Sequence, residues 1–121
     1  MFSVIKKLFQ SFLFAGRGIL SLMVNERNMR IHLLATVTVV AFGMYFNITK
    51  TEWCLVALCI GMVMAAEAFN TSIELLTDLV KPEFHPIAGK IKDAAGGAVL
   101  LAAITAAIAG LLIFGKYFFP K

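Results

Sequence analysis

The feature that most constrains this chain is a pair of long runs without a charged residue. Residues 31–49 and 94–115 contain no Asp, Glu, Lys or Arg. A helix needs about 20 apolar residues to cross a hydrocarbon core about 30 Å thick. Each run therefore predicts a membrane-spanning helix. The 60% hydrophobic composition and the mean hydropathy of +0.89 agree, because soluble domains are closer to half apolar.

A third uncharged run, residues 53–66, is too short to reach across the membrane. Its 14 residues cover only about 21 Å as a helix. The helix must therefore carry Glu67 and Asn70 at membrane depth before it reaches water near Asp78. No proline interrupts residues 52–80, and the segment KPEFHP then ends the helix. We expect a third membrane helix over residues 52–80 and a loop over residues 81–93.

The first 25 residues have a different pattern, in which phenylalanines alternate with lysine, glutamine and arginine. This pattern predicts an amphipathic helix over residues 1–25 that lies in the membrane interface. A cleaved signal peptide is the alternative, but no A-x-A-like site follows a compact apolar core. The predicted fold is an all-α integral membrane protein: one domain, residues 1–121, with an amphipathic N-terminal surface helix and three transmembrane helices.

The charged residues give this fold an orientation. Eight of the eleven basic residues fall on the side of the amino terminus and the 81–93 loop. The positive-inside rule places that side in the cytoplasm. Six of the seven acidic residues lie in or toward the same half, and only Glu52 lies outside it.

Four polar residues of the third helix share one face. Glu67, Asn70, Glu74 and Asp78 fall within about 80° of one another at 100° per residue. A charged side chain at bilayer depth costs several kcal/mol on most estimates, so an intramembrane acid indicates function. The structural alternative is that Glu67 and Asn70 hold helices together.

Phosphoryl transfer is the chemistry that suits this stripe. It needs a metal and cations to neutralise phosphate, and a carboxylate to accept the proton of an attacking hydroxyl. Glu74 near the interface suits Mg²⁺, Lys92 suits a phosphate, and Glu67 suits a lipid hydroxyl. No Walker A loop or protein-kinase motif set occurs. A small transporter or proton channel, with Glu67 as a relay, and a purely structural subunit are the other classes.

Several motifs resemble the prokaryotic diacylglycerol kinase family of small integral membrane lipid kinases. They cover nearly the whole chain in order: AGRG at residues 15–18, ERN at 26–28, the Glu67-x-x-Asn70-x-x-x-Glu74 core of EAFNTSIE, and EFHPIAGKIKDAAGGAV at 83–99. Their details are closer to the undecaprenol kinase branch than to the diacylglycerol-specific one. Gly96, for instance, stands where diacylglycerol-specific members can have serine.

The resemblance implies a role for each matching residue. Glu67 would be the catalytic base, assisted by Asn70, and Glu26 and Glu74 would bind the Mg²⁺ that accompanies ATP. Glu67 and Arg30 would contact the lipid. The residues implied in nucleotide binding are Lys7, Arg17, Glu26, Glu74, Asp78, Glu83, His85, Lys92 and Asp93. The resemblance also implies a homotrimer with active sites shared between subunits.

Some of these residues have a structural interpretation as well. His85 can be a surface turn residue, and Asp93 can cap the last helix. Gly96 and Gly97 can serve close helix packing. Arg30 and His32 can extend toward lipid headgroups instead of contacting substrate.

These observations predict an ATP-dependent, magnesium-requiring lipid kinase of the bacterial inner membrane. The expected acceptor is undecaprenol, with diacylglycerol as the alternative, and no nucleic-acid partner is expected.

Overall fold

A computed structural model describes residues 2–120 of the chain; Met1 and Lys121, the ends of the predicted domain, lie outside the described residues. The described part is helical, without a strand. It consists of α1 (Phe2–Asn25), α2 (Arg27–Phe46), α3 (Lys50–Val80) and α4 (Pro86–Phe118). All four helices are long and apolar enough to cross a membrane. The prediction of an all-α, multi-pass membrane protein is confirmed.

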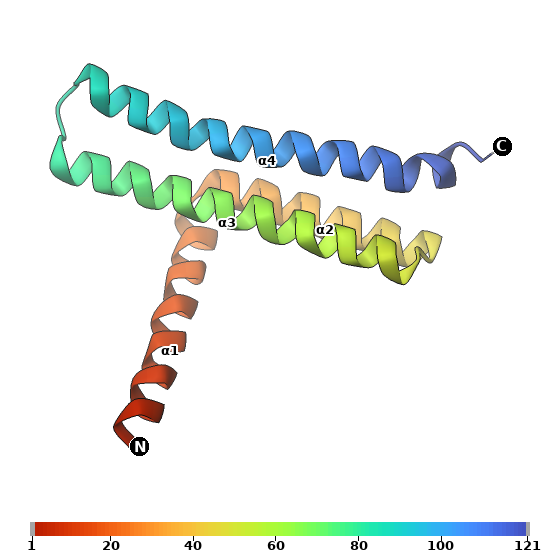
Figure 1. The fold of residues 1–121 in the computed structure, drawn as a ribbon, viewed down its shortest axis with the longest axis horizontal. Coiled ribbons are helices and arrows are strands. Elements are labelled where there is room, and N and C mark those ends of the chain that lie inside the picture. Colours follow the sequence, from red (N-terminus) through yellow and green to blue (C-terminus); the bar gives the residue numbers. More distant parts are fainter. Residues whose placement is uncertain (1, 121) are drawn as a thin grey trace.

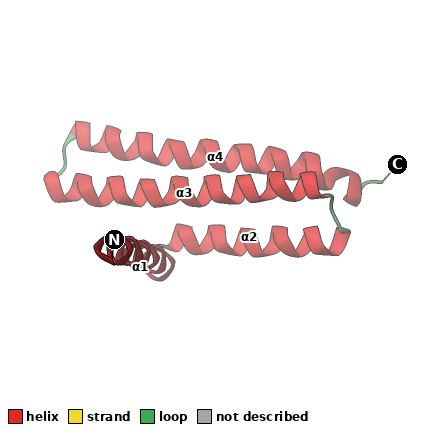
Figure 2. Ribbon diagram, turned by 60° about the horizontal axis from the view of Figure 1, so that its bottom comes forward, coloured by secondary structure: helices red, strands yellow, loops and turns green. Residues whose placement is uncertain are grey.

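Helices α2, α3 and α4 run alongside one another, and α1 points away from them (Figure 1). Figure 2 shows α4 and α3 as a long pair, with α2 against the other side of α3. Helix α1 meets the other helices through its C-terminal half. At its end, Arg30 donates hydrogen bonds to the carbonyl oxygens of Val24 (2.6 Å) and Met23 (3.4 Å). The location of α1 in the membrane interface stays a prediction.

The connection between α3 and α4 is shorter than the loop predicted over residues 81–93. Helix α4 begins at Pro86, so only residues 81–85 lie outside helices. The physical reason is that Pro86 occupies the first helical position, where the missing N–H costs nothing. His85 caps the helix, with its Nδ1 accepting from the Ile87 N–H at 3.1 Å. Asp93 therefore lies inside α4 and is not its cap.

Lys81 and Glu83 form an ion pair within this connection, with 2.9 Å between Nζ and Oε1. The hydrogen bond from Lys81 lowers the pKa of the Glu83 carboxyl below its usual value, and a backbone hydrogen bond adds to the effect. Both side chains are well exposed. The Glu83 carboxylate therefore keeps its charge to a lower pH than a free glutamate does.

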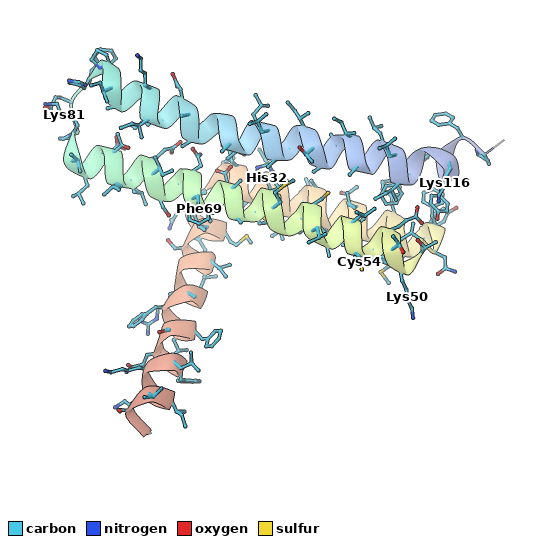
Figure 3. The ribbon with its side chains drawn as sticks, in the orientation of Figure 1. His32, Lys50, Cys54, Phe69, Lys81 and Lys116 are labelled. Carbon is cyan, nitrogen blue, oxygen red and sulfur yellow. The ribbon has the colours of Figure 1, made fainter. Side chains whose placement is uncertain are left out.

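The opposite end of the bundle is held together by Glu52. Its carboxylate accepts from the Thr49 N–H at 3.0 Å and from the Tyr117 hydroxyl at 2.7 Å, and Lys116 lies 3.0 Å away. The Thr49 and Glu52 side chains form a capping box at the start of α3. Figure 3 shows Lys116 and Lys50 at this end and Lys81 at the other. The only acidic residue expected outside the cytoplasmic half thus joins α3 to α4.

Apolar packing beside this end forms the small core of the bundle. It comprises Ile48, Val56, Ile113 and Phe114. Gly43 allows α2 to approach Trp53 closely, because a Cβ atom there would lie 2.6 Å from the indole ring. Gly96 and Gly97 have no neighbour within 4 Å of such an atom. Close packing at those two glycines is therefore absent from the described chain.

Candidate active site

Glu67 is the most deeply buried polar residue of the described chain. It is 1% exposed, and its Oε2 atom lies 3.5 Å from Nε2 of His32 on α2. The His32 side chain is 19% exposed. A carboxylate removed from water needs a partner, because an unpaired buried charge is strongly unfavourable. Within residues 2–120, His32 is that partner.

Asn70 lies one turn beyond Glu67 on α3 and is hydrogen-bonded to Glu74. The Asn70 amide nitrogen donates to Glu74 Oε1 at 3.2 Å. Two neighbouring polar atoms, Asn70 Oδ1 and Thr71 Oγ1, are buried without a hydrogen-bond partner in the described chain. Buried polar atoms are nearly always satisfied in folded proteins. This part of α3 therefore has unused capacity to bind a polar group.

The polar stripe continues to the end of the α3–α4 hairpin. Lys92 on α4 forms an ion pair with Asp78 on α3, and both side chains are partly exposed. This pair links the two helices beyond the buried section. It leaves the remaining donors of the Lys92 ammonium group open to an anion from solution.

Glu26 sits between α1 and α2, as the residue that precedes α2. It is half-buried and lines an open cleft of about 560 Å³ between α1 and α3. Thr71 lines the same cleft. The structure thus brings Glu26 to the face of α3 that carries the unpartnered Thr71 hydroxyl, next to Asn70.

The two residues of α1 that were expected to bind nucleotide lie apart from this group. Lys7 and Arg17 are exposed, and the Arg17 guanidinium lies 5.6 Å from the centre of the Phe14 ring. Arg30, expected to contact lipid, is exposed and donates from its guanidinium to the carbonyl oxygens of Met23 and Val24 at the end of α1. Glu83, His85 and Asp93 lie at or near the α3–α4 turn, at the same end as Asp78 and Lys92.

The oxygen atoms near Glu74 suit a magnesium ion. Mg²⁺ prefers hard oxygen ligands and commonly binds through one or two carboxylates, completed by waters and substrate phosphates. Glu74 with the unpartnered Asn70 Oδ1 supplies such atoms. Among residues 2–120, no three His, Cys, Asp or Glu residues gather as metal ligands. Phosphate oxygens and water would have to complete the coordination shell.

An apolar cavity adjoins His32, the residue that contacts Glu67. It has a volume of about 310 Å³ and lies between α2, α3 and α4. Its walls carry small residues from α4, including Ala103, Ala106 and Gly110, and His32 lies at its surface. Figure 3 labels His32 where the three helices come together. His32 therefore contacts the buried Glu67 carboxylate and also lines the apolar cavity.

The fold and the site define a multi-pass helical membrane protein whose buried carboxylate is connected to a polar, partly exposed helical hairpin. Residues 13–114 match the family model described as prokaryotic diacylglycerol kinase. The chain belongs to this family. The resemblance seen in the sequence motifs is therefore confirmed, and so is the prediction of a membrane lipid kinase.

Three relatives illustrate the range of this similarity. An undecaprenol kinase of Bacillus subtilis (strain 168) is 40% identical over 110 residues, which cover 91% of this chain and 89% of that protein. A diacylglycerol kinase of Synechocystis is 37% identical over 108 residues, or 88% of this chain and 62% of that protein. A diacylglycerol kinase of Escherichia coli (strain K12) is 26% identical over 105 residues, with 87% and 86% coverage.

Sequence reasoning missed the contact of His32 with Glu67. It treated His32 as a residue at the foot of a membrane helix that extends toward headgroups. The available signal was the presence of an ionisable side chain inside an otherwise uncharged run, which is itself rare in membrane helices. The residue that His32 contacts on α3 depends on the register of α2 against α3. The sequence pattern does not determine that register.

Proposed function

We propose that the chain transfers the γ-phosphate of ATP to the hydroxyl group of undecaprenol. The observation that carries the proposal is the burial of Glu67 at one end of a polar stripe that runs through Asn70 and Glu74 to the Asp78–Lys92 pair. The 40% identity to an undecaprenol kinase supports undecaprenol as the acceptor. Diacylglycerol is the second candidate, supported by the 37% identity to a diacylglycerol kinase.

Glu67 acts as the general base in this proposal. The acceptor hydroxyl gives its proton to a Glu67 carboxylate oxygen while its own oxygen forms a bond to the γ-phosphorus. The bond from that phosphorus to the oxygen bridging the β- and γ-phosphates breaks, and ADP leaves. Asn70 keeps Glu74 in place through its amide nitrogen. The burial of Glu67 excludes water, which would otherwise compete for the phosphoryl group.

Glu74 and Glu26 are the residues proposed to hold Mg²⁺, which when bound neutralises phosphate charge. Lys92 is proposed to contact a phosphate, with Asp78, Glu83, His85 and Asp93 around the nucleotide. Lys7 and Arg17 are proposed to add positive charge from α1, and Arg30 and Glu67 to contact the lipid. We assign no role in this chemistry to the Glu52 cluster at the far end of the bundle.

We place the protein in the bacterial inner membrane as a homotrimer. The amino terminus and the α3–α4 connection then face the cytoplasm, in line with the eight basic residues on that side. Extensive apolar surface on all helices supports contacts with lipid and with other copies. Family membership decides against the transporter or proton-channel alternative.

The test is phosphate transfer from Mg-ATP by purified protein in mixed micelles. Undecaprenol and diacylglycerol are supplied separately and in competition, and the phosphorylated lipids are separated and counted. We expect faster transfer to undecaprenol. Faster transfer to diacylglycerol would make diacylglycerol the acceptor and leave the proposed phosphoryl transfer unchanged. Transfer to neither lipid would contradict both proposed acceptors.

A further inference from the structure

Glu67 needs a fixed orientation for its proposed role, and α3 alone does not provide one. Asn70, one turn away, uses its amide nitrogen on Glu74. The described contact of the Glu67 carboxylate with another polar side chain is the one with His32, from the neighbouring helix α2. Since a carboxylate has two oxygens, a donor on Oε2 leaves Oε1 for another group.

We propose that His32 is a positioning residue for the catalytic base. Its Nε2–H donates toward Oε2 of Glu67, which fixes the carboxylate plane and turns Oε1 toward the acceptor hydroxyl. This inference rests on the proposed role of Glu67. An Nε2–H donor is present both in the imidazolium and in one neutral tautomer, so the contact does not require a charged histidine.

The separation of 3.5 Å between the two atoms is that of an ion-pair contact, longer than an ordinary hydrogen bond. Catalytic hydrogen bonds are often long in structures without substrate and shorten when the reacting complex forms. His32 keeps its proton throughout the step. The hydroxyl proton moves to Oε1 of Glu67, the oxygen–phosphorus bond forms, and the bond to the departing ADP breaks.

The imidazole of His32 has different surroundings on its two sides. His32 lies in the second turn of α2, where the Thr36 hydroxyl donates to its backbone carbonyl oxygen at 2.8 Å and leaves the imidazole uninvolved. The imidazole lies at the surface of the apolar cavity, which it shares with Thr36 and Val63. An apolar wall on one side and a carboxylate on the other restrict the ring to a position between the two.

The same location supplies the rival explanation, that His32 merely forms part of the wall of a lipid cavity. The two explanations differ in which kinetic constant they affect. A wall residue changes the KM for the lipid, independently of Glu67. A positioning residue changes kcat, and only while Glu67 is present to be positioned.

The experiment is a double-mutant cycle with His32→Leu, Glu67→Gln and the double variant. Phosphate transfer from Mg-ATP to undecaprenol in mixed micelles gives kcat and the lipid KM of each. We expect His32→Leu to lower kcat roughly 10-fold in the natural background, and less than about 2-fold in the Glu67→Gln background, as for contacting residues that act together. The lipid KM should change little.

Two further variants separate chemistry from folding. His32→Gln places an amide N–H near the position of Nε2, and we expect it to recover most of kcat. Thr36→Val is the matched control, because it changes the same helix and the same cavity without removing the donor to Glu67. It should leave kcat unchanged. Size-exclusion profiles of each purified variant report assembly, and His32→Asn, whose amide is too short to reach, replaces His32→Leu if the latter does not assemble.

Each result decides between the explanations. Equal losses from His32→Leu in both backgrounds, a loss confined to the lipid KM, or an equal kcat loss in Thr36→Val would overturn the positioning role. Near-normal turnover of Glu67→Gln alone would instead remove Glu67 as the base, and thereby the proposed function of this site. The failure of one proposal is thus distinguishable from the failure of the other.

Discussion

Glu67 combines almost complete burial with a single described polar partner, and this makes its substitution informative. Glu67→Gln keeps the size and the hydrogen-bonding capacity of the side chain but removes its ability to accept a proton. We expect turnover to fall by roughly 10² or more, the usual scale for a lost general base. ATP binding and assembly should be retained. Steady-state kinetics, with nucleotide binding measured by calorimetry, checks both points, and turnover near that of the unchanged protein would contradict the assignment.

Glu74 belongs to the phosphate end of the same stripe, so its loss should have a different effect. Glu74→Ala removes a carboxylate and leaves the Asn70 amide nitrogen without its acceptor. We expect weaker binding of Mg-ATP and a higher magnesium requirement, with the lipid KM unchanged. Titration of activity with Mg²⁺ measures this.

Ser72→Ala is the control for Glu74→Ala, because Ser72 is exposed on the same helix and its hydroxyl bonds only to the Ala68 carbonyl oxygen in the described chain. Its magnesium titration should match that of the unchanged protein. A Glu74→Ala variant that lost lipid affinity and kept its affinity for nucleotide would contradict the metal assignment.

At the residue scale, the stripe itself was predictable and its contacts were not. Glu67, Asn70 and Glu74 share a face by helical periodicity alone, and the short uncharged run before them already indicated burial. The contact of Glu67 with His32, and the cleft that brings Glu26 near Thr71, join different helices. Such contacts depend on helix register, which apolar side chains in a membrane specify only weakly.

At the element scale, α3 and α4 are longer than a bilayer requires. Their 31 and 33 residues correspond to roughly 45–50 Å of helix against a hydrocarbon core of about 30 Å. We expect the extra length to project from the membrane on the side of Lys81, where the hairpin carries Asp78 and Lys92. The predicted loop extended to the uncharged run that begins at residue 94, but the residues before that run belong to α4, which begins at Pro86.

Helix α2 approaches α3 closely at Gly43, so a substitution at this position tests the packing of the two helices. A Cβ atom at Gly43 would lie 2.6 Å from the Trp53 ring, and the rigid indole packs against the apolar core, so it cannot move aside without disturbing that core. We expect Gly43→Ala to destabilise the protein by about 1–3 kcal/mol, the usual cost of overpacking. Thermal unfolding in detergent measures the change.

Gly61→Ala is the matched control for Gly43→Ala, because the structure shows nothing within 4 Å of a Cβ atom at Gly61. An alanine there should be neutral or stabilising, since alanine is the better helix former. Equal stability of the two variants would mean that Trp53 does not limit the approach of α2 to α3.

At the scale of the whole molecule, one chain leaves much of its surface and its site without partners. Among residues 2–120, eight apolar residues are buried, while α1 extends away from the other helices with most of its side chains from Ser3 onward exposed (Figure 1). Lys7 and Arg17 on α1 are therefore not part of the group around Glu67. The number of helices could be inferred from the sequence pattern, whereas the cytoplasmic side stays a prediction from the basic residues. The assembly could not, because lipid-facing and subunit-facing apolar surfaces have similar compositions.

The proposed trimer predicts that α1 of one subunit completes the site of another. We would co-express Glu67→Gln subunits with Arg17→Ala subunits, each variant having first been shown to be at least tenfold less active alone. A mixed trimer then contains sites in which an intact Arg17, supplied by one chain, faces an intact Glu67 from its neighbour. Random mixing restores roughly a quarter of the sites in a closed symmetric ring, so we expect about that fraction of activity.

The control mixture combines Glu67→Gln with Glu74→Ala subunits. Both positions lie on α3 of one chain and, through Asn70, belong to one site, so mixing should restore nothing. Crosslinking establishes that both mixtures form trimers. Recovery in the Arg17 mixture alone requires that the cation and the base come from different subunits. If both mixtures form trimers and neither recovers activity, α1 serves the site of its own chain. The proposal of a shared site would then be wrong, whereas the proposed kinase chemistry of α3 would be unaffected.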